Sequence, residues 1–212
     1  MLQKNGALKP RKKPVQDRST VTCDAIFEAT IQVLLAMGPE QLTTTKVADR
    51  AGVSVGTLYQ YFGNKQSLLS AVTEKHLLEV AESIERACCQ QVGLNVEEII
   101  DGLFDAYFDA KFSRPDVSKA LYAVAADVDG NQMVKTLMQR VQVNICQLLQ
   151  SAKGLEIEDT ITTAFVLTTT MVGPVQTLLT IDAPDAYRDK VKSELKRMAL
   201  LYLTNGKRQI LY

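Results

Sequence analysis

Apolar side chains recur at intervals of three and four residues along nearly the whole sequence. In residues 20–37, for example, Ile26, Thr30, Val33 and Met37 fall on one face of a helix. No segment shows the strict alternation of a half-buried strand, and no Asn-Gly turn stands between β-branched runs. The pattern therefore predicts an all-α protein.

Polar residues and glycines mark where the expected helices begin and end. Side chains that can accept from free backbone N–H groups begin several of them: Thr43 or Thr44, Ser54, Asn64, and Asn95 with Glu98. Gly52 suits the left-handed turn between the second and third helices. The expected helices span about residues 20–37, 44–51, 55–62, 65–91, 96–112, 115–126, 132–153, 158–180 and 185–204.

Charge is distributed unevenly, although the net charge is zero. The first 20 residues set only Asp17 against a group of basic side chains: Lys4, Lys9, Arg11, Lys12, Lys13 and Arg18. One basic end suits a chain that meets a polyanion there. The same segment lacks the apolar run of a signal peptide, so we expect a cytoplasmic protein.

Residues 160–181 contain no charged side chain and are long enough to span a bilayer. Threonines, Gln176 and the pair Gly173-Pro174 interrupt the run, and no aromatic belt flanks it. We therefore expect a buried helix and no membrane partner.

The sequence offers little for metal, cofactor or catalytic chemistry. Its four cysteines lack metal-ligand spacing, and His76 is its only histidine, expected to be structural. Neither a Gly-rich phosphate loop nor a nucleophile elbow occurs. We expect no cofactor, no metal site and no enzyme activity.

The expected third helix has two different faces. Leu58 and Phe62 form an apolar side, and Tyr59 is expected to be mainly core. The opposite side carries small or hydrogen-bonding groups of the kind that enter a DNA major groove: Gly56, Thr57, Gln60 and Tyr61.

This segment belongs to a longer spaced motif. Thr43 to Leu68 reads T-x-x-x-V-A-x-x-A-G-V-S-x-G-T-L-Y-x-Y-F-x-x-K-x-x-L, which resembles the DNA-binding signature of the tetracycline-repressor (TetR) family. The resemblance covers about residues 20–70. It implies a homodimer that reads a palindromic double-stranded DNA operator with one recognition helix per half-site.

The resemblance also implies which residues face DNA: Thr45, Ser54, Val55, Gly56, Thr57, Gln60, Tyr61 and Lys65. Lys65 would meet a phosphate. Val55 stands where the family commonly has a polar or basic residue, which favours contact with a thymine methyl group.

The expected helix over residues 96–112 carries more aromatic side chains than one face usually buries. They form either plain core or, as the resemblance favours, part of an apolar effector pocket. The expected pocket residues are Phe104, Tyr107, Phe108, Tyr122, Met138, Phe165, Thr169 and Met171. The acids at 97, 101, 105 and 109 form a solvated column, or one of them turns inward towards a cationic ligand.

The resemblance places dimerisation on the last two helices, through Val191, Leu195, Met198 and Tyr202. The expected organisation is a flexible basic arm (1–19), a three-helix helix-turn-helix domain that binds DNA (20–67), and a helical bundle for ligand binding and dimerisation (68–212). The expected function is a repressor that releases its operator when a small, largely apolar effector binds. A redox-responsive regulator acting through the cysteines, and an enzyme built on the helical domain, are the alternatives.

Overall fold

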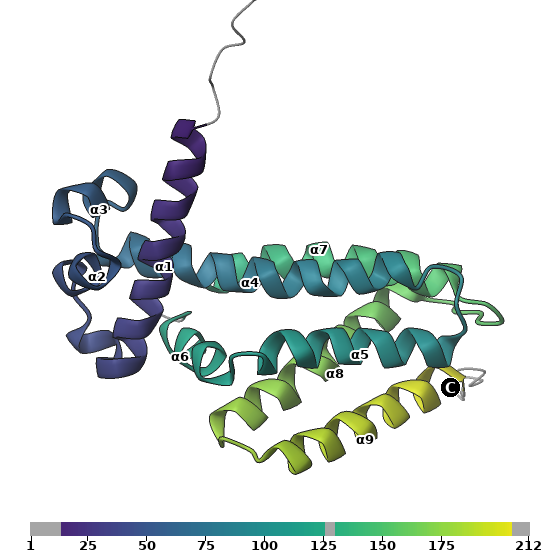
Figure 1. Ribbon diagram of the computed structural model, residues 1–212. Helices are drawn as coiled ribbons and strands as arrows, with labels where there is room; N and C mark the ends of the chain where they lie inside the picture. The colour runs from purple at the N-terminus through teal and green to yellow at the C-terminus, as the bar shows by residue number, and fades with distance from the viewer. Residues whose placement is uncertain (1–13, 126–129, 205–212) are drawn as a thin grey trace, which may run out of the picture. The chain divides into compact units, whose positions relative to one another are not determined.

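A computed structural model of the chain describes residues 14–125 and 130–204. Its regular elements there are helices, which confirms the all-α prediction (Figure 1). In chain order they are α1 (Pro14–Gln41), α2 (Thr44–Ala51), α3 (Val55–Tyr61), α4 (Lys65–Gln90), α5 (Val96–Phe112), α6 (Pro115–Ala125), α7 (Gly130–Ser151), α8 (Thr160–Thr180) and α9 (Asp185–Thr204).

The start of α1 corrects one boundary. The helix begins at Pro14, so residues 14–19, predicted as part of a flexible arm, are helical. Proline suits a first helical position because its missing N–H has no partner to lose there. The arm residues Arg11, Lys12 and Lys13 lie outside the described residues. At its other end, α1 is kinked at Gly38, whose φ of 76° interrupts the helix before Gln41.

The chain divides into two compact units, residues 1–68 and 69–212, and the boundary falls within α4. In the first unit, α2 packs on α1 and α3 packs on α2. Ile26, Leu42, Val47 and Leu58 are completely or almost completely buried there. The ring of Phe27 lies 5.5 Å from that of Phe62, which joins α1 to the end of α3.

Within the described residues, one helical segment, Ser19–Gln41, is long and apolar enough to cross a membrane. Ile26, Ala29, Thr30 and Val33 of this segment are buried in the first unit. The segment is therefore also the core helix of that unit, and its composition needs no membrane to explain it.

The second unit is built around α5. Helices α6, α7, α8 and α9 all contact it, and Figure 1 shows α9 running along α5 and α8. Ile99, Leu103 and Phe104 of α5 are at most 2% exposed. The predicted capping pair is confirmed: Asn95 accepts from Glu98 N, and the Glu98 carboxylate accepts from Asn95 N.

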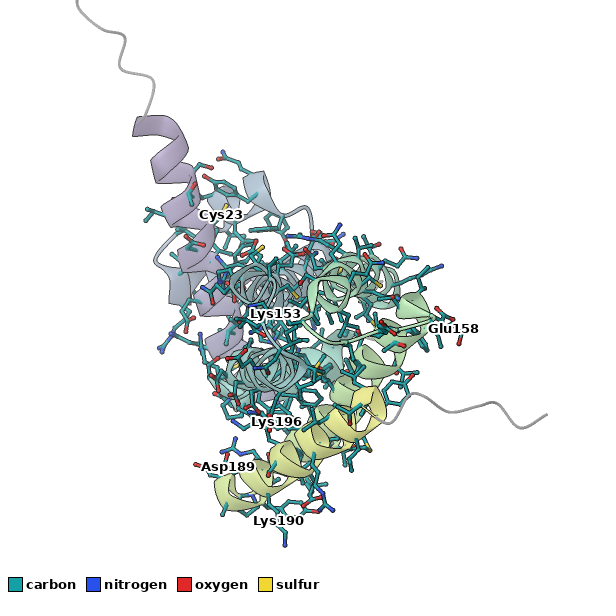
Figure 2. All side chains as sticks on the ribbon, turned by 90° about the vertical axis from the view of Figure 1, so that its right-hand side faces the viewer. Cys23, Lys153, Glu158, Asp189, Lys190 and Lys196 are labelled. Atoms are coloured by element: carbon teal, nitrogen blue, oxygen red, sulfur yellow. The ribbon has the colours of Figure 1, made fainter. Side chains whose placement is uncertain are left out.

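The acidic column of α5 is not simply solvated, as the sequence had suggested. Asp105 lies 3.0 Å from both Lys192 and Lys196, and Asp101 lies 3.1 Å from Lys196. Figure 2 labels Lys196 on α9, whereas Lys190 points away from the bundle. Partial burial works against ionisation, but hydrogen bonds from the two lysines hold the pKa of Asp105 below its usual value. These ion pairs join α9 to α5 at the surface of the bundle.

The turn between α2 and α3 generates a first prediction. Gly52 has a φ of 68°, where a Cβ is strained even though no atom lies within 4 Å of its position. Gly52→Ala should lower the free energy of unfolding by about 1–2 kcal/mol, measured by urea unfolding. Gly63→Ala is the control, because Gly63 has equal space and no left-handed φ. Equal losses in both variants would show that the turn conformation is not the cause.

Candidate nucleic-acid interface

The hydroxyl of Ser54 sets the start of α3. Its Oγ accepts from Thr57 N at 2.9 Å and lies 2.8 Å from Thr57 Oγ1. Gly52 closes α2 by donating its N–H to Ala48 and Asp49, and Thr43 caps the start of α2. These caps satisfy backbone groups that a seven-residue helix leaves free. They fix the direction of α3, as the sequence predicted.

Burial of Leu58 turns the opposite side of α3 outward. Gly56, Gln60 and Tyr61 are exposed there, whereas Val55 and Thr57 are half-buried. Thr45, on α2, is exposed as well. The predicted DNA-facing residues of these helices are therefore accessible in the first unit, and each one's contact with a base or phosphate stays a prediction.

Tyr59 corrects the sequence prediction of a core residue. Its side chain is 49% exposed, and its hydroxyl lies 3.1 Å from Thr44 Oγ1. The pair joins α3 to the first turn of α2 on the outer side of the turn. Sequence reasoning missed Thr44 and Tyr59 as surface groups because an aromatic residue next to Leu58 matches a core pattern equally well.

Lys65 has a structural partner that the sequence did not indicate. Its Nζ donates to the backbone oxygen of Pro39 at 2.6 Å, which ties the first turn of α4 to the kinked end of α1. Pro39 lies in the last turn of α1, whose carbonyls have no partner within the helix, and the bond satisfies one of them. The predicted phosphate contact of Lys65 would compete with this bond or share its ammonium.

The second unit contains an apolar cavity of about 100 Å³ between α4, α5, α6, α7 and α8. Three of the predicted pocket residues line it: Tyr107, Tyr122 and Met138. The other lining residues are Leu77, Val80, Ala81, Ile84, Lys111, Val134, Leu137, Val141, Thr168 and Val172.

The remaining predicted pocket residues lie elsewhere. Phe104, Phe108 and Met171 belong to the packed core, and Phe165 is 52% exposed. Thr168 lines the cavity in place of Thr169, because one residue turns a helix by roughly 100° and changes the face.

Lys111 is the charged residue among the lining residues that the sequence prediction missed. It is 2% exposed, and its Nζ lies 4.5 Å from the centre of the Tyr122 ring. Burial lowers the pKa of Lys111 to about 8. Burial also raises the pKa of Tyr107 well above its usual value. A lysine near the end of an amphipathic helix usually complements the helix dipole at the surface, so the sequence carried no signal for its burial.

His76 lies next to this group, on α4. Its Nε2 is 3.2 Å from Ser118 Oγ, and that hydroxyl donates to the backbone oxygen of Lys111 at 2.8 Å. Burial, together with the positive charges of Lys111 and Arg114, lowers the pKa of His76 to about 4. The imidazole is thus neutral at pH 7.

An open groove of about 630 Å³ runs along α9 beside Pro174 of α8. Val191, Leu195 and Met198, three of the predicted dimer residues, line it. Tyr202 is 43% exposed on the same helix but does not line the groove.

The cysteines give no support to a redox mechanism. No disulfide joins them in the described residues, and burial raises the pKa of Cys88 to about 12, which suppresses the reactive thiolate. Burial also raises the pKa of Cys146. In residues 14–125 and 130–204, no group of His, Cys, Asp and Glu side chains is arranged to hold a metal ion.

Two family models match the chain. Residues 26–72 match the model described as bacterial regulatory proteins, tetR family. Residues 96–203 match the model described as tetracyclin repressor-like, C-terminal domain.

Individual relatives agree with these matches. The HTH-type transcriptional regulator BetI 1 of Chromohalobacter salexigens is 28% identical over 110 residues, 44% of this chain and 54% of the relative. The class A tetracycline repressor protein of transposon 1721, from Escherichia coli, is 39% identical over 56 residues, 26% of each chain. This chain covers about half of the length of the first of these relatives. It covers less than half of the length of the others.

The fold has solved counterparts. The fatty acid degradation regulator FadR from Bacillus halodurans superposes with a TM-score of 0.69 and 20% identity, covering 94% of this chain and 100% of that one. The shared helical fold therefore covers more of this chain than the segments in which its sequence resembles the relatives named above.

The burial of His76 predicts a pH dependence of stability. Between its folded pKa of about 4 and its ordinary value of 6.5, the unfolded chain binds a proton that the folded chain does not. The free energy of unfolding should therefore fall by up to about 3 kcal/mol from this group as pH drops through that window. Urea unfolding at pH 7, 6, 5 and 4 measures it. His76→Gln, which keeps a polar partner for Ser118, should flatten the dependence. An unchanged slope in this variant would contradict the assignment.

Proposed function

This chain belongs to the tetR family of bacterial regulatory proteins, and from that premise we propose that it is a repressor that binds a palindromic operator as a homodimer. A small effector in the cavity of the second unit releases the DNA. The single observation that carries this proposal is the accessible, hydrogen-bonding side of α3, held outward by the burial of Leu58.

The chemistry of that side suits direct readout of bases. The amide of Gln60 can bond both N6 and N7 of adenine, and Val55 can contact a thymine methyl group. Gly56 lets the backbone at the start of α3 come close to a phosphate. Tyr59 and Thr44 add two hydroxyls at the edge of the same surface. Operator binding would place the protein in the cytoplasm, and the name of the class A relative supports repression.

A homodimer supplies the second recognition helix that a palindrome requires. The groove along α9 supports this arrangement, because Met198, Leu201 and Tyr187 are about half exposed and line it. Apolar side chains gathered in one open groove are typical of an interface.

Effector and operator can be coupled through α4. This helix begins with Lys65 in the first unit and contributes Leu77, Val80 and Ile84 to the cavity. A ligand that displaces these side chains shifts α4 and with it the separation of the recognition helices. Those helices must match half-sites about 34 Å apart, so the operator would be released.

Gln60→Ala tests the reading surface. The variant should lose about 1–3 kcal/mol of discrimination between operator and mutated operator while keeping its affinity for random DNA. Fluorescence anisotropy with the DNA upstream of its own gene, at several salt concentrations, measures both. Gln90→Ala is the control, since Gln90 is an exposed glutamine at the far end of α4. Equal losses on specific and random DNA would contradict a base contact, and no binding by the folded wild type at low salt would contradict the function.

Met198→Glu tests the dimer. A carboxylate buried in the proposed interface would strongly destabilise the dimer, whereas the half-exposed position of Met198 leaves the fold of one chain intact. Light scattering after size exclusion should therefore report monomers. Val92→Glu, at a 64% exposed valine outside the groove, should stay dimeric. A dimeric Met198→Glu would exclude this face as the interface.

A further inference from the structure

Lys111 is a buried cation that lines the cavity. Its Nζ lies over the ring of Tyr122, and burial is the sole cause that lowers its pKa. In the part of the chain that the structure describes, no carboxylate forms an ion pair with it. An unpaired ammonium in apolar surroundings destabilises a fold by several kcal/mol unless something offsets the loss of hydration.

Among the described residues that line the cavity, Lys111 carries the charge. Asp101 and Asp105 of α5 do not line the cavity, and both form ion pairs with lysines of α9. His76 experiences positive charge from Lys111 and Arg114. The sequence left open a cationic ligand held by one of the acids of α5. Lys111 would repel such a ligand in this cavity, whereas it would attract an anion.

The size and lining of the cavity limit the rest of the ligand. Apart from Lys111, Tyr107, Tyr122 and Thr168, its lining is aliphatic or thioether. A volume of about 100 Å³ is somewhat below that of an apolar cavity of about 150 Å³ that holds benzene. One ring or a short branched chain is the largest body that fits without movement of the helices.

We propose that the effector is a small organic monocarboxylate whose carboxylate pairs with Lys111 and whose apolar body lies against α4, α7 and α8. This inference rests on the proposed function of the cavity as an effector site. Because Tyr122 lines the cavity and carries the ammonium on its ring, Lys111 can reach a ligand there without leaving the helix bundle. One ammonium balances the single charge of a carboxylate, while the neutral His76 offers no second charge for a phosphate.

The protonation of Lys111 can be measured separately, because the groups that face it keep their charge in the pH range in which it titrates. His76 of α4 stays neutral above pH 7, because its pKa is about 4. Burial raises the pKa of Tyr107 and of Tyr122, and Arg114 stays charged throughout. The lining residues of α7 and α8 do not titrate. Raising the pH from 7 to 9 takes Lys111 through its pKa of about 8, so the affinity for a carboxylate should fall about tenfold.

The test compares benzoate and 3-methylbutanoate with their neutral amides, benzamide and 3-methylbutanamide, on the full chain by calorimetry. Wild type should bind at least one carboxylate more than tenfold tighter than its amide, with the pH dependence given above. Lys111→Met should lose this preference and its pH dependence, and it should melt at a higher temperature without ligand, because it removes an unpaired buried charge. Lys153→Met, at an exposed lysine, should behave as wild type.

Two results would overturn the inference: no binding of either carboxylate to wild type, or a preference for carboxylate that survives in Lys111→Met. Operator binding by the unliganded wild type, measured alongside, reports separately on the proposed function. If wild type binds operator but prefers the amides, the result supports the proposed function and contradicts a monocarboxylate effector.

Discussion

The outward direction of the polar side of α3 depends on tertiary burial, because α2 and α3 are too short to be stable alone. α2 has eight residues and α3 has seven, whereas isolated helices below about 12–15 residues are marginal in water. Val47 and Leu58 are fully buried, and Phe62 packs on Phe27 of α1. Caps at both ends satisfy the free backbone groups, so the apolar side is fixed inward. The polar side of α3 therefore faces outward.

In the second unit, burial likewise fixes the orientation of α5, and its faces have different roles. One face forms the core through Leu103 and Phe104, and another faces α9 with Asp101 and Asp105. Exposed ion pairs contribute little to stability, but these pairs balance the charge of Asp101 and Asp105. The cavity is left with Lys111 as its charged group. α5 thus carries acids on its outer face and a buried lysine on the face that lines the cavity.

The sequence predicted those features of the fold that depend on neighbouring residues. The caps at Ser54 and Asn95 and the left-handed Gly52 follow from neighbouring residues alone, and the structure confirms them. Contacts between distant residues could not be predicted in this way. Lys65 bonds an oxygen 26 residues away, and Tyr59 is held outward by Thr44 on another helix. The cavity differs from the predicted pocket for the same reason, since a single residue step separates Thr168 from Thr169 and places them on different faces.

The central claim is that this chain reads a two-fold symmetric DNA sequence through α3. Selection of bound duplexes from a random pool by the full-length protein, followed by sequencing, tests it most directly. The account predicts enrichment of an inverted repeat whose half-sites have centres one DNA turn, about 34 Å, or a multiple of it apart. A pool that stays random after repeated selection at low salt, or that converges on a sequence without two-fold symmetry, would contradict the account.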